Sequence, residues 1–225
     1  MVAQITTVPS STALRLGQVF ATVDAACCPK RINLHLHTVY SDGRMRPEEV
    51  IDQAIALGVE HISITDHHTV DGYLLAQKYL SSCTAQTKPI LWAGVEINAS
   101  LLFTEVHLLG YGFDPHHKAM RPYLQSKTTA GVDYQAVSVT QAIHQAGGLV
   151  VLAHPARYRR RPAELITAAV PLGIDGVETY YGYENHDPWR PSSHQSEQIH
   201  ALGQKFGLFH SCGTDSHGFK ITRRL

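Results

Sequence analysis

Apolar and polar residues alternate along this chain in short segments that predict strands and helices in turn. Residues 31–36, RINLHL, alternate apolar side chains with Asn33 and His35, which is typical of a strand. Apolar segments of similar length predict further strands at 61–65, 89–98, 105–113, 149–153, 175–181 and 208–213.

The segments between these strands have the spacing and end signals of helices. Residues 46–58 begin with Pro47 and two glutamates and end at Gly58, which is typical of a complete helix. Helices are also predicted at 71–83, 132–147, 162–173 and 192–207. The order βαβαββαβαβαβ favours an α/β domain over residues 31–225, with a largely parallel sheet or barrel. Residues 1–30 are interpreted as an N-terminal extension.

Composition excludes several functional classes. The 225 residues are 44% hydrophobic and 17% charged, with 19 basic and 19 acidic side chains, so no extended nucleic-acid surface is expected. No apolar segment approaches the ~20 residues of a membrane helix. The N-terminus lacks the apolar core of a secretory signal. The four cysteines form no CxxC pair, which favours reduced thiols and a cytoplasmic protein.

Histidine is the unusual residue, with 15 copies. Six histidines and three carboxylates fall at or just after a predicted strand, mostly at its C-terminal end. These nine residues are His35, His37, Asp42, His67, Glu96, His107, His154, Asp215 and His217. The C-terminal ends of barrel strands meet on one face, so we expect the nine side chains in one cleft.

Spacing favours a metal site there. Residues two apart in a strand share a face, so His35 and His37 can reach one ion, and Asp215 and His217 repeat this pattern. Nitrogen and oxygen ligands suit Mn, Fe or Zn. Nine ligands exceed the needs of one ion, so two or three divalent ions sharing Glu96 are predicted. Such ions can activate water and stabilise phosphoryl transfer.

Other polar residues near these positions are predicted to contact the substrate or to orient the ligands. His68 is expected in the pocket wall, where it contacts substrate, and Arg157 is expected to bind a substrate phosphate. Asp66 is predicted to orient a ligand histidine. For Glu178, a similar role, a substrate contact and a structural ion pair all remain open.

The motifs HLHTVYSDG, ITDHHTVDG, LAHPAR and GTDSHG, with the glutamate of GVEI and the histidine of HLLGYG, resemble the PHP (polymerase and histidinol phosphatase) domain family. The resemblance covers residues 31–218. It implies a distorted (β/α)7 TIM-like barrel with a trinuclear site. It places His35, His37, Glu96 and Asp215 on the first ion. Glu96, His107 and His154 would hold the second ion, and Asp42, His67 and His217 the third.

Within the family, the motifs are most similar to a stand-alone branch that includes nucleoside 3′,5′-bisphosphate phosphatases and a 5′-to-3′ exoribonuclease. We therefore expect a metal-dependent phosphoesterase that uses a metal-activated hydroxide on a small phosphate ester, nucleotide or short oligonucleotide. The predicted catalytic residues are Asp215, His217, His154 and Arg157. Two alternatives are a histidinol-phosphate phosphatase and a non-catalytic metal-binding module.

Overall fold

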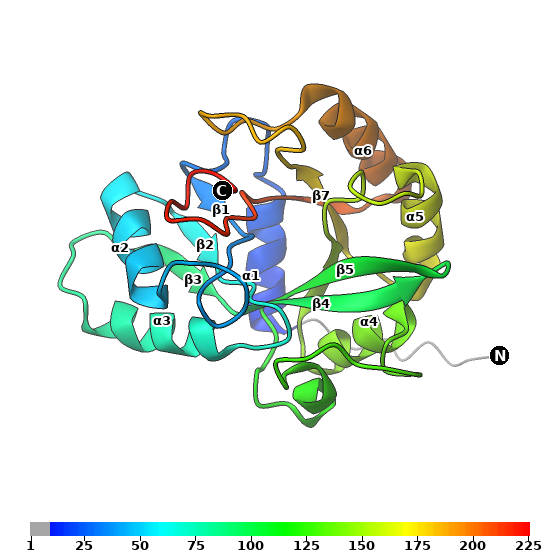
Figure 1. Cartoon of the computed structure of the whole chain (residues 1–225), viewed down its shortest axis with the longest axis horizontal. Coiled ribbons are helices and arrows are strands. Elements are labelled where there is room, and N and C mark those ends of the chain that lie inside the picture. Colours follow the sequence, from blue (N-terminus) through cyan, green and yellow to red (C-terminus); the bar gives the residue numbers. More distant parts are fainter. Residues whose placement is uncertain (1–9) are drawn as a thin grey trace.

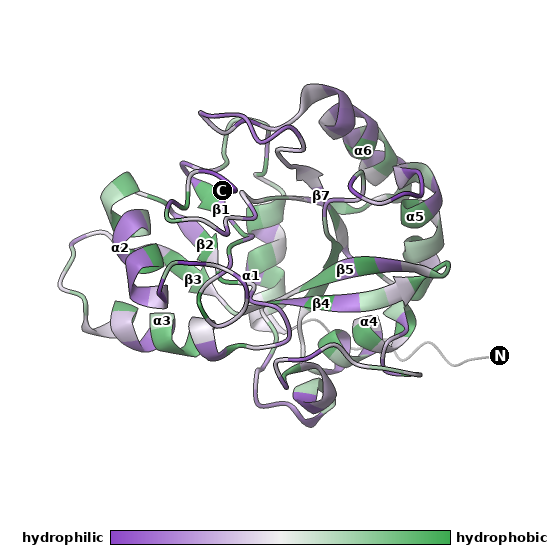
Figure 2. Ribbon diagram, in the orientation of Figure 1, coloured by the Kyte–Doolittle hydropathy of each residue, from purple (hydrophilic) through white to green (hydrophobic). Residues whose placement is uncertain are grey.

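Two β-sheets carry the fold in the computed structural model, which describes residues 10–225 (Figure 1). The first sheet is parallel and contains β1 (Ile32–Asn33), β2 (His61–Ser63) and β3 (Ile90–Trp92). Helices α2 (Pro47–Leu57) and α3 (Asp71–Ser82) pack beside it. Their apolar faces bury Val50, Ile51 and Ala76 in one cluster with Ile62 of β2. Figure 2 shows both hydrophobic and hydrophilic colours on these helices, as expected for helices with one buried face.

The second sheet has five strands in chain order. These strands are β4 (Gly94–Leu101), β5 (Thr104–Tyr111), β6 (Leu149–Leu152), β7 (Gly176–Tyr180) and β8 (Phe209–Cys212). Helix α4 (Ala136–Gln145) packs on β4, β5 and β6, and α6 (Ser193–Phe206) packs on β7 and β8. Helix α5 (Pro162–Ala169) contacts α6 and β4. The largest hydrophobic cluster lies between this sheet and its helices.

Strand β5 runs antiparallel to both of its neighbours, whereas β6, β7 and β8 are parallel. The reversal occurs at Leu102 and Phe103, which both have positive φ angles, of 52° and 58°. Two consecutive residues with positive φ make the tight turn that matches the twist of a hairpin. Four of the six strand pairs are parallel, in line with the largely parallel sheet expected from the sequence. The reversed direction of β5 was not predicted, because neither Leu102 nor Phe103 is a residue type that usually marks such a turn.

Main-chain hydrogen bonds join the two sheets at two places. Beside β1, the amide of Leu34 donates to Cys212 at 3.1 Å. Beside β4, the amide of Glu96 donates to Asp66 at 3.2 Å, and its carbonyl accepts from His68 at 3.0 Å. The strand pairing itself gives two separate sheets and not one closed barrel. These bonds nevertheless bring the ends of β1, β2, β4 and β8 together.

Several element boundaries differ from the predicted ones. The strand predicted at 31–36 pairs regularly only over β1, followed by a bridge between Leu36 and Ser216. The segment predicted as one strand at 89–98 forms β3 and β4. The helix predicted at 162–173 becomes α5 and the short 3-10 helix η2 (Val170–Leu172), because Pro171 has no amide hydrogen to continue an α-helix. Another 3-10 helix, η1 (Lys118–Tyr123), precedes α4.

The predicted N-terminal extension contains helix α1 (Ser11–Phe20), which was not predicted from the sequence. Residues 1–9 lie outside the described part of the chain. Leu16 and Phe20 of α1 are buried, and the Phe20 ring contacts Tyr111 edge-on. Across residues 10–225, no helix has both the length and the apolar character that a membrane crossing requires.

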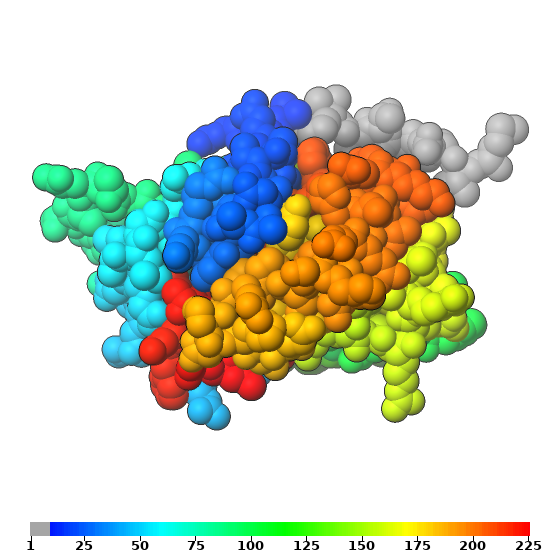
Figure 3. Space-filling view, turned by 90° about the horizontal axis from the view of Figure 1, so that it is seen from above, coloured from blue at the N-terminus to red at the C-terminus, as the bar shows by residue number. Residues whose placement is uncertain are grey.

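The C-terminal segment folds back beside β1, where Ile221 is fully buried among residues of α2 and β2. Figure 3 shows this segment, in red, between the cyan residues of the first sheet region and the gold residues near 185. The amide of His217 donates to the carbonyl of Arg224 at 2.7 Å, and the hydroxyl of Thr214 donates to that of Ile221 at 2.9 Å. The segment is therefore fixed close to the residues that follow β8.

Candidate metal centre

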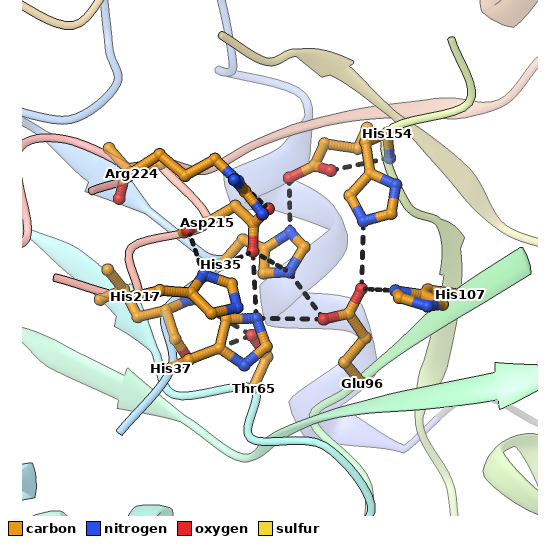
Figure 4. Close-up of polar contacts among 12 residues, drawn as sticks. His35, His37, Thr65, Glu96, His107, His154, Asp215, His217 and Arg224 are labelled. Atoms are coloured by element: carbon orange, nitrogen blue, oxygen red, sulfur yellow. Dashed lines mark hydrogen bonds and ion pairs between the residues drawn. The ribbon is translucent and has the colours of Figure 1, made fainter. Parts of the chain in front are cut away.

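Glu96 lies at the centre of a buried cluster of histidines (Figure 4). It projects from β4 and is only 1% exposed. One carboxylate oxygen, Oε2, is 3.0 Å from His35 Nε2 and 3.1 Å from His37 Nε2. The other oxygen, Oε1, is 2.7 Å from His107 Nδ1 and 3.2 Å from His154 Nε2. Both oxygens of this carboxylate therefore face imidazole nitrogens, the arrangement needed to bridge two cations.

Electrostatics keep Glu96 ionised in this position. Burial raises its pKa, but the neighbouring imidazoles, first His35 and then His107, hold it well below the usual value. Burial lowers the pKa of His37, and the adjacent carboxylates of Asp215 and Glu96 more than offset this, raising the pKa to about 9. The carboxylates therefore attract positive charge strongly into this largely buried cluster.

Asp215 follows β8 and uses its two oxygens differently. Oδ1 is 3.1 Å from His37 Nε2 and 3.5 Å from His217 Nδ1. Oδ2 faces away and accepts hydrogen bonds from Tyr181 at 2.7 Å and Arg224 at 2.8 Å. The backbone of Asp215 has a φ of 52°, which is rare for a residue with a side chain and marks local strain. Such strain is common where a side chain must be aimed at a functional site.

Asp42 approaches the same histidines from the loop after β1. Its carboxylate is 3.1 Å from His217 Nε2, 3.5 Å from His37 Nδ1 and 3.9 Å from His67 Nε2. Asp42 is 55% exposed, so this side of the cluster opens to solvent. Burial raises its pKa, and the hydrogen bond to His217 with the charges of nearby histidines brings the pKa well below its usual value.

Three groups of side chains have the ligand atoms and proximity to hold a metal ion, since their atoms lie within 4.8 Å of one another. The groups are His35, His37, Glu96 and Asp215; His67, Glu96 and His107; and His37, Asp42, His67 and His217. The first and last contain the ligand sets that the family resemblance implied. The second has His67 where His154 was expected, although His154 also reaches Glu96.

The chemistry of this cluster fits divalent ions. His37 Nε2 is buried and has no hydrogen-bond partner among the residues that the structure describes, yet carboxylate oxygens of Glu96 and Asp215 lie 3.1 Å away. An ion between these three groups would satisfy the nitrogen and the oxygens together. Imidazoles and carboxylates suit Mn, Fe or Zn, and none of the three groups found among the described residues includes a cysteine.

Glu178 is fully buried behind the cluster, in the middle of β7. One oxygen is 2.9 Å from His35 Nδ1, and the other accepts the amide of His154 at 2.8 Å. Of the roles left open by the sequence, the contacts show a carboxylate that orients a cluster histidine. By holding Nδ1, Glu178 directs His35 Nε2 toward Glu96 and Asp215.

Asp66 was predicted to orient a ligand histidine, and within residues 10–225 it reaches one only indirectly, through the Ser41 hydroxyl, which lies 3.5 Å from His37 Nδ1. Its carboxylate accepts bonds from the Thr38 amide at 2.7 Å, the Thr38 hydroxyl at 2.6 Å and the Ser41 hydroxyl at 2.7 Å. The turn after β1 presents these donors closer to Asp66 than any imidazole. Asp66 therefore fixes the loop that carries Asp42 and acts on the cluster only through that loop.

The two predicted substrate contacts lie at different edges of the cluster. His68 is 2% exposed, and its Nε2 lies 3.3 Å from Asn98 Oδ1, at the margin of an open cleft of about 430 Å³. Arg157 follows β6 by five residues and donates to Asp215 Oδ2 at 3.1 Å. Both are beside the proposed ligands, with Arg157 the more accessible.

Sequence reasoning missed Tyr181 and Arg224, which both donate to Asp215. Arg224 lies in the run TRRL near the C-terminal end of the sequence, where a charge run usually predicts a solvated surface. Tyr181 lies directly after β7 in a segment that reads as ordinary apolar strand. No spacing in the sequence distinguishes either residue, because the contact depends on the C-terminal segment folding back.

Comparisons with known proteins agree with this geometry. The sequence profile of the PHP domain matches residues 33–185. A 5′-3′ exoribonuclease of Haemophilus influenzae is 30% identical over 142 residues, which are 57% of this chain and 50% of that protein. A 3′,5′-nucleoside bisphosphate phosphatase of Chromobacterium violaceum is 36% identical over 95 residues, which are 42% of this chain and 32% of that protein. The chain thus spans half or less of the length of these curated relatives.

Solved structures support the same fold. An amidohydrolase from Chromobacterium violaceum matches with a TM-score of 0.69 over 84% of this chain and 88% of that one, at 22% sequence identity. The profile match covers more than half of the sequence and includes the segments that contribute His35, Glu96 and His154. The chain belongs to the PHP domain family.

Proposed function

We propose that this chain is a metal-dependent phosphoesterase that hydrolyses phosphate esters of nucleotides or short oligonucleotides. One observation carries the proposal: eight nitrogen- and oxygen-bearing side chains from separate strands and loops form one cluster with the buried carboxylate of Glu96. Two or three divalent ions would be held there by His35, His37, Asp42, His67, Glu96, His107, His154, Asp215 and His217. We also propose that the two sheets together form the distorted barrel typical of this family.

Ions at this centre would supply positive charge for phosphate oxygens and would acidify water to give a nucleophile at neutral pH. The protein's own residues would fix the geometry of that chemistry. Glu96 would hold neighbouring ions at a fixed separation, and Asp215 and His217 would orient groups on the solvent side. Arg157 would bind a phosphate oxygen that does not react, as a guanidinium can through paired hydrogen bonds.

The open cleft beside the centre suits a nucleotide-sized substrate. Its volume is about 430 Å³, and its lining includes Tyr40, Asp42, His67 and Lys127. Tyr40 is 38% exposed, so its ring is available to a base. Lys127 comes from the short segment between η1 and α4. The named activities of the exoribonuclease and bisphosphate phosphatase relatives favour the same substrate class.

Phosphate release tests the proposal directly. The substrates are adenosine 3′,5′-bisphosphate, short 5′-phosphorylated RNA and histidinol phosphate, each assayed with Mn and with a chelator. We expect Mn-dependent release from a nucleotide substrate and none with chelator. Release only from histidinol phosphate would select the alternative phosphatase. Failure to hydrolyse these substrates and a generic aryl phosphate would refute catalysis and favour a metal-binding module.

Two variants separate the centre from the rest of the protein. Asp215→Asn removes the charge of a proposed ligand without changing its shape. The control, Asp187→Asn, removes an exposed carboxylate that lies 2.7 Å from Arg223 Nη1. Asp187 belongs to none of the three metal-binding groups. Turnover should be lost in the first variant and kept in the second. Full activity of Asp215→Asn would contradict the assignment.

A further inference from the structure

A second, smaller cleft lies on the far side of Asp215 from the histidines. We call it the Arg157–Arg224 cleft; it has a volume of about 110 Å³. Its lining consists of two guanidinium groups, two tyrosines and a short loop, contributed by Arg157, Arg224, Tyr181, Tyr183, Gly182 and Asn185. The space is large enough for a tetrahedral oxyanion and too small for a nucleoside.

The two guanidinium groups in this cleft have more donors than the protein uses. Arg157 donates through Nη1 to Asp215 Oδ2 at 3.1 Å and to the Tyr181 hydroxyl at 3.3 Å. Arg224 donates through Nε to the same Asp215 oxygen at 2.8 Å. A guanidinium carries five N–H groups. Within residues 10–225, no acceptor is assigned to the remaining N–H groups of either side chain.

Charge in the cleft is also unbalanced. Two cations share one carboxylate oxygen of Asp215, and the other oxygen of that carboxylate faces His37 at 3.1 Å. The two exposed acidic residues of the neighbouring loop have other partners: Glu184 pairs with His186 at 2.7 Å, and Asp187 pairs with Arg223 at 2.7 Å. The cleft therefore presents excess positive charge that an oxyanion would neutralise.

The fold fixes the position of Arg224 beside the cleft. Its own backbone carbonyl accepts from the His217 amide, and buried Ile221 anchors the segment three residues earlier. The side chain of Arg224 is 19% exposed and that of Arg157 is 39% exposed, so both remain accessible. A preorganised guanidinium loses little conformational entropy when it binds an anion.

We infer that the Arg157–Arg224 cleft is a phosphate subsite, separate from the metal centre, that binds the second and unreactive phosphate of the substrate. This inference rests on the proposed phosphoesterase function. Because Asp215 borders both sites, one substrate with two phosphates can reach the metal centre and the cleft together. The preferred substrate class is therefore a nucleotide with two separate phosphate groups.

Binding of inorganic sulfate and phosphate to the metal-free protein, measured by calorimetry, tests the subsite without catalysis. Arg224→Gln should weaken binding about tenfold to a hundredfold, the loss expected for charge-assisted hydrogen bonds. The neighbouring Arg223→Gln, whose side chain pairs with Asp187, should bind like the wild type. Tyr181→Phe removes a donor to Asp215 but keeps both guanidiniums, so it should retain binding. Equal binding by Arg224→Gln and wild type would overturn the subsite.

Substrate selectivity, measured with Mn present, distinguishes the two phosphates. Arg224→Gln should raise KM for adenosine 3′,5′-bisphosphate about tenfold or more. It should leave KM nearly unchanged for the adenosine monophosphate that carries only the reacting phosphate. An equal rise for both substrates would place Arg224 on the reacting phosphate and overturn the inference. Arg224→Lys, which keeps the charge but not the fork, should show an intermediate effect.

The subsite and the proposed function can fail separately. Sulfate binding that depends on Arg224, in a wild-type protein that hydrolyses no phosphate ester, would support the anion subsite and refute the phosphoesterase. Mn-dependent hydrolysis with no role for Arg224 would support the enzyme and refute the subsite. Arg224→Gln should unfold at a lower urea concentration than Arg223→Gln, because Asp215 loses a buried partner. Its circular dichroism spectrum without urea should match that of the wild type, which shows that lost binding is not lost folding.

Discussion

Replacing Glu178 by Gln is the most informative change behind the metal centre. Glu178 is fully buried, and each of its oxygens accepts one hydrogen bond, from His35 Nδ1 at 2.9 Å and from the His154 amide at 2.8 Å. The glutamine side chain has the same shape but only one acceptor atom. Since both partners donate, no orientation of the amide can satisfy them both.

The size of the effect follows from this mismatch. One buried N–H loses its acceptor and faces another donor, which costs about 1–3 kcal/mol of stability. His35 also loses a charge that supports it: burial lowers its pKa, and Glu178 is the first of the carboxylates that raise the pKa well above its usual value. A histidine freed from its orienting carboxylate typically binds metal about 10–100-fold more weakly. We therefore expect both losses from this one substitution.

Two assays measure them separately. Urea unfolding of the metal-free protein gives the change in the free energy of unfolding, and Mn titration gives the change in affinity. The control is Glu164→Gln, which breaks a surface pair with Arg161 and should leave stability nearly unchanged. If Glu178→Gln matched its control in both assays, the orienting role of Glu178 would be refuted.

Three further changes test other features. Asp215→Asn should abolish Mn-dependent turnover with an unchanged circular dichroism spectrum; retained turnover would contradict its role. Gly213→Ala should destabilise the chain by about 1–3 kcal/mol in urea, because the added Cβ would overlap the Cβ of His35 and lie 2.6 Å from its amide nitrogen; wild-type stability would contradict this packing. Burial, with the charge of His200, lowers the pKa of His210 to about 4 from 6.5. Protonation therefore favours the unfolded chain, so stability should fall as pH drops from 6.5 toward 4, and His210→Asn should reduce that fall; equal pH profiles would refute it.

Local patterns predicted the element types well because they depend on neighbours in sequence. Helix α2 begins at Pro47 and is capped by Gly58, as expected. The direction of β5 was not predictable in the same way, since it depends on a two-residue turn that lacks glycine or asparagine. Pro171 ended α5 earlier than the apolar pattern indicated, which shows how one missing amide outweighs periodicity.

The residues of the site also separate into those predictable from local sequence and those whose contacts depend on the tertiary fold. His35, Glu96 and Asp215 could be placed together from sequence because each was predicted at or just after the end of a strand, and parallel strand ends converge. Asp66 could not be assigned, because its partners lie in a turn whose geometry appears only in three dimensions. Arg224 was missed for a similar reason: its contact with Asp215 requires a fold-back anchored by Ile221.

Charge balance connects these missed residues with the predicted ones. Glu96, Asp215 and Glu178 are three carboxylates at most 1% exposed, and such a group is costly without compensation. Arg224 and Arg157 supply two permanent charges to Asp215. The remaining negative charge is directed at the histidine nitrogens, where a divalent ion is the natural partner. Arg157 belongs to the LAHPAR motif, but Arg224, the second cation that makes this burial tolerable, comes from a segment with no motif. Each arginine therefore compensates Asp215 on one side and leaves its remaining N–H groups to the Arg157–Arg224 cleft.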